Sequence, residues 1–280
     1  MKRVLTIQDI SGVGKCSLTE ALPIISAAGV ECAVLPTTVL STHTAFEGFT
    51  FHDLTDDLPG IAEHWAKLGL EFSSIYTGYL GSIHQVELVK AIIGRFRTEE
   101  NLVLVDPAMA DHGKLYAGFV PEFVGAMKSL CAIADVVVPN ITEAAFLLEQ
   151  EYIAEGYSED YIRGLLKGLT DLGPRTSVLT GVSFAEDELG AMAYDRETET
   201  FFSYFTDREP KNFHGTGDLF ASALVGALEN GFAIEDGIRI ASEYTLASLR
   251  ATLNDPEGRW YGVNFEEALP VYMRLLGKLL

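Results

Sequence analysis

The amino-acid sequence predicts an α/β fold in which helices cover both faces of a mostly parallel sheet. Short runs rich in Val, Ile and Leu alternate with longer amphipathic stretches along most of the 280 residues. Runs such as "LVLVD" (102–106) and "DVVVP" (135–139) are largely apolar, as expected of parallel strands that are buried on both faces. Between residues 190 and 206, two strand-like runs flank a short polar turn, so the sheet should end in an antiparallel hairpin at its edge.

The expected elements follow one another along the whole chain. The strands should cover residues 4–8, 31–39, 74–78, 102–106, 135–139 and 176–180, with the hairpin strands at 190–195 and 200–206. The helices should cover residues 17–28, 56–68, 82–97, 120–131, 141–149, 158–172, 217–230, 234–253 and 265–279. No repeat, low-complexity tract or linker interrupts this pattern, so we expect one domain over residues 1–280.

Composition limits the kinds of partner. Forty acidic against 20 basic residues give a formal charge of −20, which argues against nucleic acid because clustered Lys and Arg bind phosphate backbones. A nucleotide substrate is compatible with this charge, since a helix N-terminus, one basic side chain and Mg²⁺ suffice locally. The three cysteines are dispersed without metal-binding spacing, and no apolar run is long enough to cross a membrane. The opening "MKRVLTIQD" predicts a strand rather than a signal peptide, so we expect a cytoplasmic protein.

The stretch "SGVGKCS" (11–17) resembles part of a P-loop. A P-loop needs a glycine five residues before its Gly-Lys pair and a Ser or Thr directly after the pair. Asp9 and Cys16 occupy these two positions, and Asp9 would bring a negative charge to a loop that should bind an anion. The stretch is therefore expected to be a turn from strand to helix with a different purpose.

Polar residues follow most of the predicted strands. Open α/β sheets bind ligands at the carboxyl ends of their parallel strands, so the loops after the strands are the expected site. The candidate residues in these loops are Asp9, Ser41, Tyr79, Asp106, Asp111, Asn140, Glu143, Thr180 and the segment 214–218.

The strongest local signal is "NFHGTGDLFASALVGAL" (212–228). Gly215, Thr216 and Gly217 lead into a predicted helix, where free backbone N–H groups and the helix dipole favour an anion. Asp218 follows directly. It either caps the helix or acts as a general base beside the anion site, and the residues alone leave both roles open.

Carboxylates at two other strand ends suit a metal ion. Asp106 and Asp111 in "VDPAMAD" and Glu143 in "VPNITEA" offer the oxygen ligands that Mg²⁺ takes together with phosphate. Each of these acids alone is equally compatible with a loop or helix-capping role, as is Asn140. Polar groups at four separate strand ends together with an anion-binding turn favour a ligand site.

These motifs together resemble the ribokinase-like small-molecule kinases, and among them most closely the pyridoxal (pyridoxine, pyridoxamine) kinases. The resemblance runs over essentially the whole chain. "HGTGD" with "PNxTE" is its most specific part for the kinase superfamily, whereas "TGY" and "SxHT" point to the vitamin B6 branch. The pieces that carry it are "TIQDISGVGK" (6–15), "VLSTHTAF" (39–46), "YTGYLGS" (76–82), "VDPAMADHGKLY" (105–116), "DVVVPNITEA" (135–144) and "HGTGDLFAS" (214–222).

The resemblance implies an ATP-dependent transfer of the γ-phosphoryl group to the 5′-hydroxymethyl group of a vitamin B6 vitamer. Asp218 matches the base that takes the hydroxyl proton. The other matching positions are Gly215, Thr216 and Gly217 as the anion hole, Glu143 and Asp106 as metal-linked acids, Asn140 and Thr180 near the nucleotide phosphates, and Asp111 and Tyr116 in a flexible loop near ATP. Phosphoryl transfer depends mainly on positioning and charge neutralisation, which these residue types supply.

On the same basis, the first strand-to-helix turn faces the acceptor rather than ATP. The positions that match the acceptor pocket are Asp9 and Ser41 as ring contacts, Tyr79 beside the aromatic ring and His43 in the "SxHT" element. Lys15 in this turn is expected to face solvent.

Some residues depart from the pyridoxal kinase pattern. Val138 stands where those enzymes often carry Thr near the metal and phosphates. "DISG" and "HGTG" resemble the hydroxymethylpyrimidine kinases of thiamine synthesis, although those usually carry Cys at the position of Asp218. Lys211 is either a phosphate-neutralising residue or a surface lysine.

The motifs and these departures leave three hypotheses for the function, namely a vitamin B6 kinase, a hydroxymethylpyrimidine kinase and a catalytically idle B6-binding relative.

The resemblance also implies partners. ATP is the expected co-substrate and Mg²⁺ the expected metal, with K⁺ as a candidate activating ion. A homodimer is implied by the resemblance only, and neither nucleic acid nor a membrane is expected as a partner.

Overall fold

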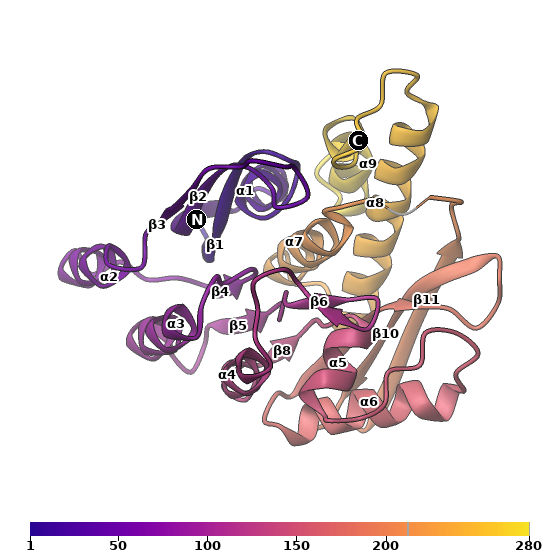
Figure 1. The fold of residues 1–280 in the computed structure, drawn as a ribbon, viewed down its shortest axis with the longest axis horizontal. Helices are drawn as coiled ribbons and strands as arrows, with labels where there is room; N and C mark the ends of the chain where they lie inside the picture. Colours follow the sequence, from indigo (N-terminus) through magenta and orange to yellow (C-terminus); the bar gives the residue numbers. More distant parts are fainter. Residues whose placement is uncertain (212, 280) are drawn as a thin grey trace.

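The computed structural model describes residues 1–211 and 213–279, and a nine-stranded sheet runs through its middle (Figure 1). From edge to edge its strands are β11 (Thr200–Asp207), β10 (Glu188–Asp195), β9 (Thr176–Val182), β8 (Val136–Val137), β5 (Leu102–Val105), β4 (Ser74–Thr77), β1 (Arg3–Val13), β2 (Glu31–Thr42) and β3 (Phe51–Asp53). The strands from β9 to β2 pair in parallel. The hairpin β10–β11 at one edge and β3 at the other are antiparallel. The predicted α/β fold with an antiparallel edge hairpin is therefore confirmed.

Helices cover both faces of the sheet, as Figure 1 shows. One face carries α2 (Leu58–Lys67), α3 (Ile83–Phe96), α4 (Glu122–Cys131), α5 (Ile141–Leu147) and α6 (Glu159–Asp171). The other carries α1 (Leu18–Ala27), α7 (Thr216–Glu229), α8 (Ile234–Asn254) and α9 (Phe265–Leu275). Successive strand residues point to opposite faces, so Val4 belongs to the second core and Leu5 to the first. None of the helices within the described residues is long and apolar enough to cross a membrane.

The observed elements differ from the expected ones mainly at their ends. The strand expected over 135–139 is reduced to Val136–Val137, although backbone hydrogen bonds from Asp135 to Val103 (2.8 Å) and from Val138 to Val105 (2.9 Å) continue beside it. Pro139, which has no N–H to donate, follows. The sequence did not predict β3 or the small hairpin formed by β6 (Ala110–Asp111) and β7 (Lys114–Leu115). These strands have two or three residues each, which is too short for an alternating pattern to appear.

The carboxyl end of strand β1 determines where a ligand site is expected. It pairs with β4 only from Val4 to Ile7 and then continues beside β2 as far as Val13. The β1–β2 register shifts between Gln8 and Ile10, because Thr37 and Thr38 of β2 together oppose Asp9. Asp9 therefore lies opposite a β-bulge, a feature that is common beside active sites. The chain runs from β1 outward to β2 and later returns on the other side of β1 as β4. The carboxyl ends of β1 and β4 therefore form the switch point at which open α/β sheets bind ligands.

Helix α7 is held rigidly in the second core. Most of its side chains are buried, and at Gly226 the backbone comes close to α1 and α9. A Cβ at this position would lie 2.9 Å from the Cβ of Ala28 and would also collide with the Tyr272 hydroxyl. That hydroxyl donates to the Ala223 carbonyl oxygen (3.0 Å), so it cannot move away without losing a buried hydrogen bond.

We expect Gly226→Ala to lower the free energy of unfolding by about 1–3 kcal/mol, because overpacking of the α1–α7–α9 contact outweighs the better helix propensity of Ala. The measurement is urea unfolding followed by circular dichroism. The matched control is Gly164→Ala on α6, where a Cβ meets no atom within 4 Å. The control should instead gain about 0.5–1 kcal/mol. Equal stability changes in the two variants would contradict the close packing at Gly226.

Candidate active site

The glycine turn before α7 has the geometry of an anion site. Gly215 is the N-cap residue with φ 84°, in the left-handed region that favours glycine. A Cβ at Gly215 would collide with the Lys15 carbonyl oxygen, so glycine is required there for a second reason. The helix begins at Thr216, and its first backbone N–H groups have no partner within the helix. With the helix dipole, these groups can receive a phosphoryl group.

Asp218 lies in the first turn of α7 and is half-buried. Burial raises the pKa of its carboxyl to about 7, a hydrogen bond from the Ser17 backbone lowers it, and the nearby charge of Asp9 raises it again. A carboxyl poised near neutral pH suits a general base, which must be ionised before the reaction and able to hold a proton after it.

Asp9 and Tyr79 are the next two candidates, and the charge of Asp9 acts on both Asp218 and Tyr79. The Ser11 hydroxyl donates to the buried Asp9 carboxylate (3.0 Å). Burial raises the pKa of Asp9, and hydrogen bonds from Ser17 and Ser11 oppose that effect. Tyr79 stacks on Phe119 with ring centroids 5.5 Å apart, and burial followed by the charge of Asp9 raises its pKa to about 12. The structure thus brings together a carboxylate, a hydroxyl and an aromatic face at the switch point.

Ser41 lies near the end of β2, and His43 follows the strand directly. The His43 ring is buried, with Nε2 3.0 Å from the Tyr261 carbonyl oxygen and Nδ1 accepting the Ala45 N–H (3.1 Å). Both ring nitrogens are engaged, so only the face or edge of the imidazole is available to a ligand. The Ser41 hydroxyl accepts the Thr50 N–H (2.8 Å) and the residue is exposed. Their role in the acceptor pocket stays a prediction.

Two further carboxylates, Asp106 after β5 and Glu143 in α5, form a buried acidic pair. Glu143 is buried, and burial raises its pKa to about 8 despite hydrogen bonds from the backbone N–H groups of Asn140, Met109 and Ala110. Burial raises the pKa of Asp106 well above its ordinary value, and the charges of Glu143 and Asp218 raise it further. Within the described residues, no group of three or more His, Cys, Asp or Glu side chains is placed to hold a metal. A Mg²⁺ ion here would need phosphate or water oxygens to complete its shell.

Asn140 and Thr180, the residues expected near the nucleotide phosphates, lie at the same sheet edge as Glu143. Asn140 caps α5, because its side chain accepts the Glu143 N–H (2.9 Å) and donates to the Ala110 carbonyl oxygen (2.8 Å). Asn140 and Thr180 form a parallel bridge, which places Thr180 at the same sheet edge. The Asn140 side chain is thus already engaged within the protein.

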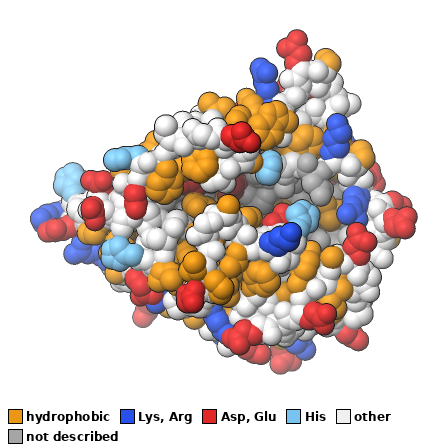
Figure 2. Space-filling model, viewed as in Figure 1, with side chains coloured by type: hydrophobic (Ala, Val, Ile, Leu, Met, Phe, Trp, Pro, Cys, Tyr) orange, Lys and Arg blue, Asp and Glu red, His pale blue; other side chains and the backbone are white. Residues whose placement is uncertain are grey.

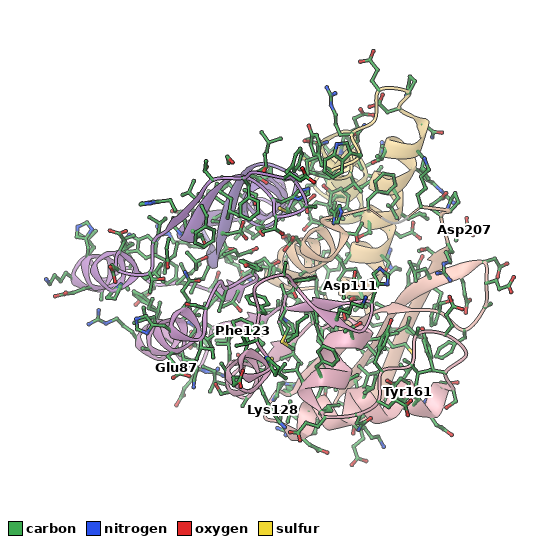
Figure 3. The ribbon with its side chains drawn as sticks, in the orientation of Figure 1. Glu87, Asp111, Phe123, Lys128, Tyr161 and Asp207 are labelled. Atoms are coloured by element: carbon green, nitrogen blue, oxygen red, sulfur yellow. The ribbon has the colours of Figure 1, made fainter. Side chains whose placement is uncertain are left out.

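The β6–β7 hairpin forms one wall of the site. Figure 3 labels Asp111 on this hairpin, where its side chain is exposed. Tyr116 follows this hairpin and is 39% exposed, while burial of its hydroxyl and the charges of Glu143, Asp111 and Asp106 raise its pKa. The Gly113 N–H donates to the Thr142 hydroxyl (3.1 Å), which ties the hairpin to α5. Figure 2 shows a hollow near the middle of this face with acidic side chains in and beside it.

Two lysines differ in their surroundings. Lys211 is exposed and precedes residue 212, which lies outside the described residues, so its role stays a prediction. The expectation that Lys15 faces solvent is wrong. Its ammonium donates to the carbonyl oxygen of Val263 (3.0 Å) and to the side chains of Asn264 (3.2 Å) and Glu266 (2.9 Å). Lys15 therefore fastens the turn after β1 to the start of α9, a long-range contact that the local sequence does not show.

Sequence reasoning also missed residues next to the site. Phe46 and Trp260 form an aromatic pair with ring centroids 4.6 Å apart, and Trp260 lies 6.0 Å from the His43 ring. Glu20 on α1 is fully buried beside Gly215. Only Glu20 had a signal in the sequence, because it is an acid on the apolar face of an amphipathic helix.

The fold is shared with solved kinase structures. The Lactobacillus plantarum pyridoxal kinase is 30% identical, with a TM-score of 0.89 over 98% of both chains. A Bacteroides thetaiotaomicron protein that carries the name phosphomethylpyrimidine kinase, crystallised in one form with pyridoxal, is 36% identical, with a TM-score of 0.92 over 97% of this chain and 95% of that one. The Leishmania donovani pyridoxal kinase in complex with ADP and pyridoxamine shows the same fold, at 20% identity and a TM-score of 0.88 over 98% and 96%. The fold and site thus define a ribokinase-like phosphotransferase with an alcohol acceptor.

The sequence profile of the family described as phosphomethylpyrimidine kinase matches residues 27–261. The chain belongs to this family. Curated relatives include the Arabidopsis thaliana pyridoxal kinase, 27% identical over 90% of this chain and 81% of the relative. They also include the Mycobacterium tuberculosis (strain ATCC 25618 / H37Rv) hydroxymethylpyrimidine/phosphomethylpyrimidine kinase, 26% identical over 93% and 92%. The resemblance inferred from the motifs is therefore confirmed at the level of the family.

The position of Asp218 predicts how activity depends on pH. Because its raised pKa of about 7 belongs to the free protein, the base becomes protonated as the pH falls through this value. We expect kcat/KM to rise with pH as Asp218 ionises and to fall nearly tenfold per pH unit on the acid side of about pH 7. Initial rates of ADP formation at subsaturating acceptor test this, with circular dichroism at each pH as the control for folding. A flat profile between about pH 5 and 7 would rule out Asp218 as the titrating base.

Proposed function

We propose that the protein is an ATP-dependent kinase that phosphorylates the 5′-hydroxymethyl group of a vitamin B6 vitamer. The observation that carries the proposal is the place of Asp218. It lies in the first turn of α7 directly after the glycine turn, and its charge interacts with those of Asp9 and Asp106. A base between an acceptor pocket and an acidic, phosphate-compatible pocket is the arrangement that phosphoryl transfer to an alcohol requires.

Both the acceptor and the donor in this proposal have support from similar proteins. The pyridoxal-containing crystal form of the Bacteroides protein, 36% identical, supports a pyridine acceptor. Stacked Tyr79 and Phe119 offer an aromatic wall for such a ring, and Asp9 with Ser11 offers polar contacts to its substituents. The ADP complex of the Leishmania enzyme supports ATP as the donor.

The acidic pair fits a divalent cation. Burial raises the pKa values of Asp106 and Glu143; the charges of Glu143 and Asp218 raise that of Asp106 further, and the charge of Asp111 raises that of Glu143. A cation would relieve both the burial and the repulsion. Mg²⁺ held there with the nucleotide would neutralise charge on the phosphates. K⁺ remains a candidate activating ion.

The residues of the chain then divide the work. Asp9 and Tyr79 orient the ring so that the hydroxymethyl group faces Asp218. The Asp218 carboxylate accepts the hydroxyl proton as the oxygen attacks the γ-phosphorus and the bond to the ADP leaving group breaks. The backbone N–H groups of Gly215, Thr216 and Gly217 stabilise the charge on the phosphoryl group while it moves. We propose that the chain performs this as one kinase domain and assembles as a homodimer.

A second candidate is phosphorylation of hydroxymethylpyrimidine. The family description and the Mycobacterium relative favour it. Asp218 weighs against it, since the hydroxymethylpyrimidine kinases usually carry Cys there. The catalytically idle relative was suggested by Val138, which is buried and offers no oxygen to a metal.

A coupled ADP-release assay over pyridoxal, pyridoxine, pyridoxamine, hydroxymethylpyrimidine and ribose tests the proposal. We expect the highest kcat/KM for a B6 vitamer. Asp218→Asn should lower kcat by about 10²–10⁴-fold and leave nucleotide binding largely intact, because it removes the base and keeps the shape. Asp56→Asn, an exposed substitution outside the residues assigned to the site, is the control for handling and should keep full activity.

Each hypothesis has its own outcome in this assay. Preference for hydroxymethylpyrimidine would favour the second candidate, and no acceptor-dependent ADP formation would favour the idle relative. Near-normal turnover by Asp218→Asn would contradict the mechanism whatever the acceptor.

A further inference from the structure

Glu20 is a buried acid that the proposed reaction does not use. It lies on α1 with no exposed surface, and neither carboxyl oxygen has a hydrogen-bond partner among residues 1–211 and 213–279. Burying an ionised carboxylate without a partner is costly, so such groups are rare in folded proteins. Its position therefore calls for an explanation.

The Glu20 carboxyl faces the back of the glycine turn. Helices α1 and α7 lie side by side (Figure 1), and both Glu20 oxygens point toward Gly215. A Cβ on Gly215 would lie 3.1 Å from Oε1 and 3.2 Å from Oε2, and the Lys15 carbonyl oxygen approaches the same point. Glu20 thus touches the N-cap residue whose left-handed conformation sets the direction of the first N–H groups of α7.

The surroundings of Glu20 are mostly acidic. Burial raises its pKa well above the ordinary value, and the charges of Asp218 on α7 and Glu266 on α9 raise it further, whereas Lys15 lowers it. The Lys15 ammonium is itself 2.9 Å from Glu266, so that cation is shared. The other titratable groups that face Glu20 are the Cys16 thiol and the Tyr244 hydroxyl.

Ionisation of Glu20 would oppose the reaction. A carboxylate behind the turn would place negative charge beside the N–H groups that must accept a migrating phosphoryl group, in a setting with little water to screen it. The neutral acid has no such effect and can offer an O–H donor toward the Lys15 carbonyl oxygen.

We propose that Glu20 is a positioning residue that supports Gly215 as a neutral carboxylic acid and, when it ionises, closes the anion hole to phosphate. Asp218 must lose its proton for activity and Glu20 must keep its proton. The proposal rests on the proposed function. It predicts that kcat has an alkaline limb that belongs to Glu20, in addition to the acid limb of Asp218.

The test compares the pH profile of kcat for the wild type and Glu20→Gln between about pH 6 and 10. Wild-type kcat should fall nearly tenfold per pH unit on the alkaline side, whereas Glu20→Gln should match the wild type near neutral pH and stay level. The matched control is Glu229→Gln, which removes another buried acid at the C-terminal end of α7, away from the glycine turn, and it should keep the alkaline limb. Cys16→Ser should also keep it, which separates the thiol from Glu20.

A second readout does not depend on activity. A carboxyl with a raised pKa in the folded state loses its contribution to stability as the pH rises from its unfolded value through its folded value. The urea midpoint of Glu20→Gln relative to wild type should therefore increase with pH over that range. An alkaline limb that persists in Glu20→Gln, or a midpoint difference that is constant with pH, would overturn the proposal. If no acceptor is turned over, the stability comparison still decides the state of Glu20.

Discussion

The buried carboxylates around the start of α7 are the constraint on which the rest of the structure depends. Asp9, Asp106, Glu143 and Asp218 all have pKa values raised by burial, and Asp218 also feels the charge of Asp9. Gathering acids in this way costs free energy in the empty protein, because burial disfavours the charged form. Such a site is relieved by a cation that enters with phosphate, which is why strongly shifted carboxyls mark functional sites.

Local features of the backbone hold these acids in place. A bulge in β2 lies opposite Asp9, a capping box fixes Glu143 against Asn140, and a left-handed glycine starts the helix that carries Asp218. Each device is anchored in one of the two cores on either side of the sheet. Because α7 is nearly buried along its length, the base stands on a rigid element, as precise phosphoryl transfer requires. The hairpin that carries Asp111 lies at the surface, and hydrogen bonds from Gly113 to Thr142 and from Asn140 to Ala110 tie it to α5.

Much of this arrangement could be predicted from the sequence, since periodicity and strand-end chemistry are local. The apolar strands, the edge hairpin and the turn at Gly215 followed from pattern alone. Lys15 could not be placed, because its partners at 263–266 are close only after folding. His43 and Asn140 were expected to contact ligands, but the sequence did not show that their polar atoms bind the protein's own backbone. The catalytic and binding roles themselves stay predictions, since a role depends on ligand geometry.

The central claim is that a cation-bound nucleotide relieves the buried acids. The most direct measurement is calorimetric titration of Mg²⁺ with ADP into the protein at about pH 7, in buffers of different ionisation enthalpy. Because Glu143 has a pKa of about 8 and Asp218 of about 7 without ligand, both are partly protonated there. Binding should lower these pKa values and release protons to the buffer. Binding without proton release, or with proton uptake, would contradict the account.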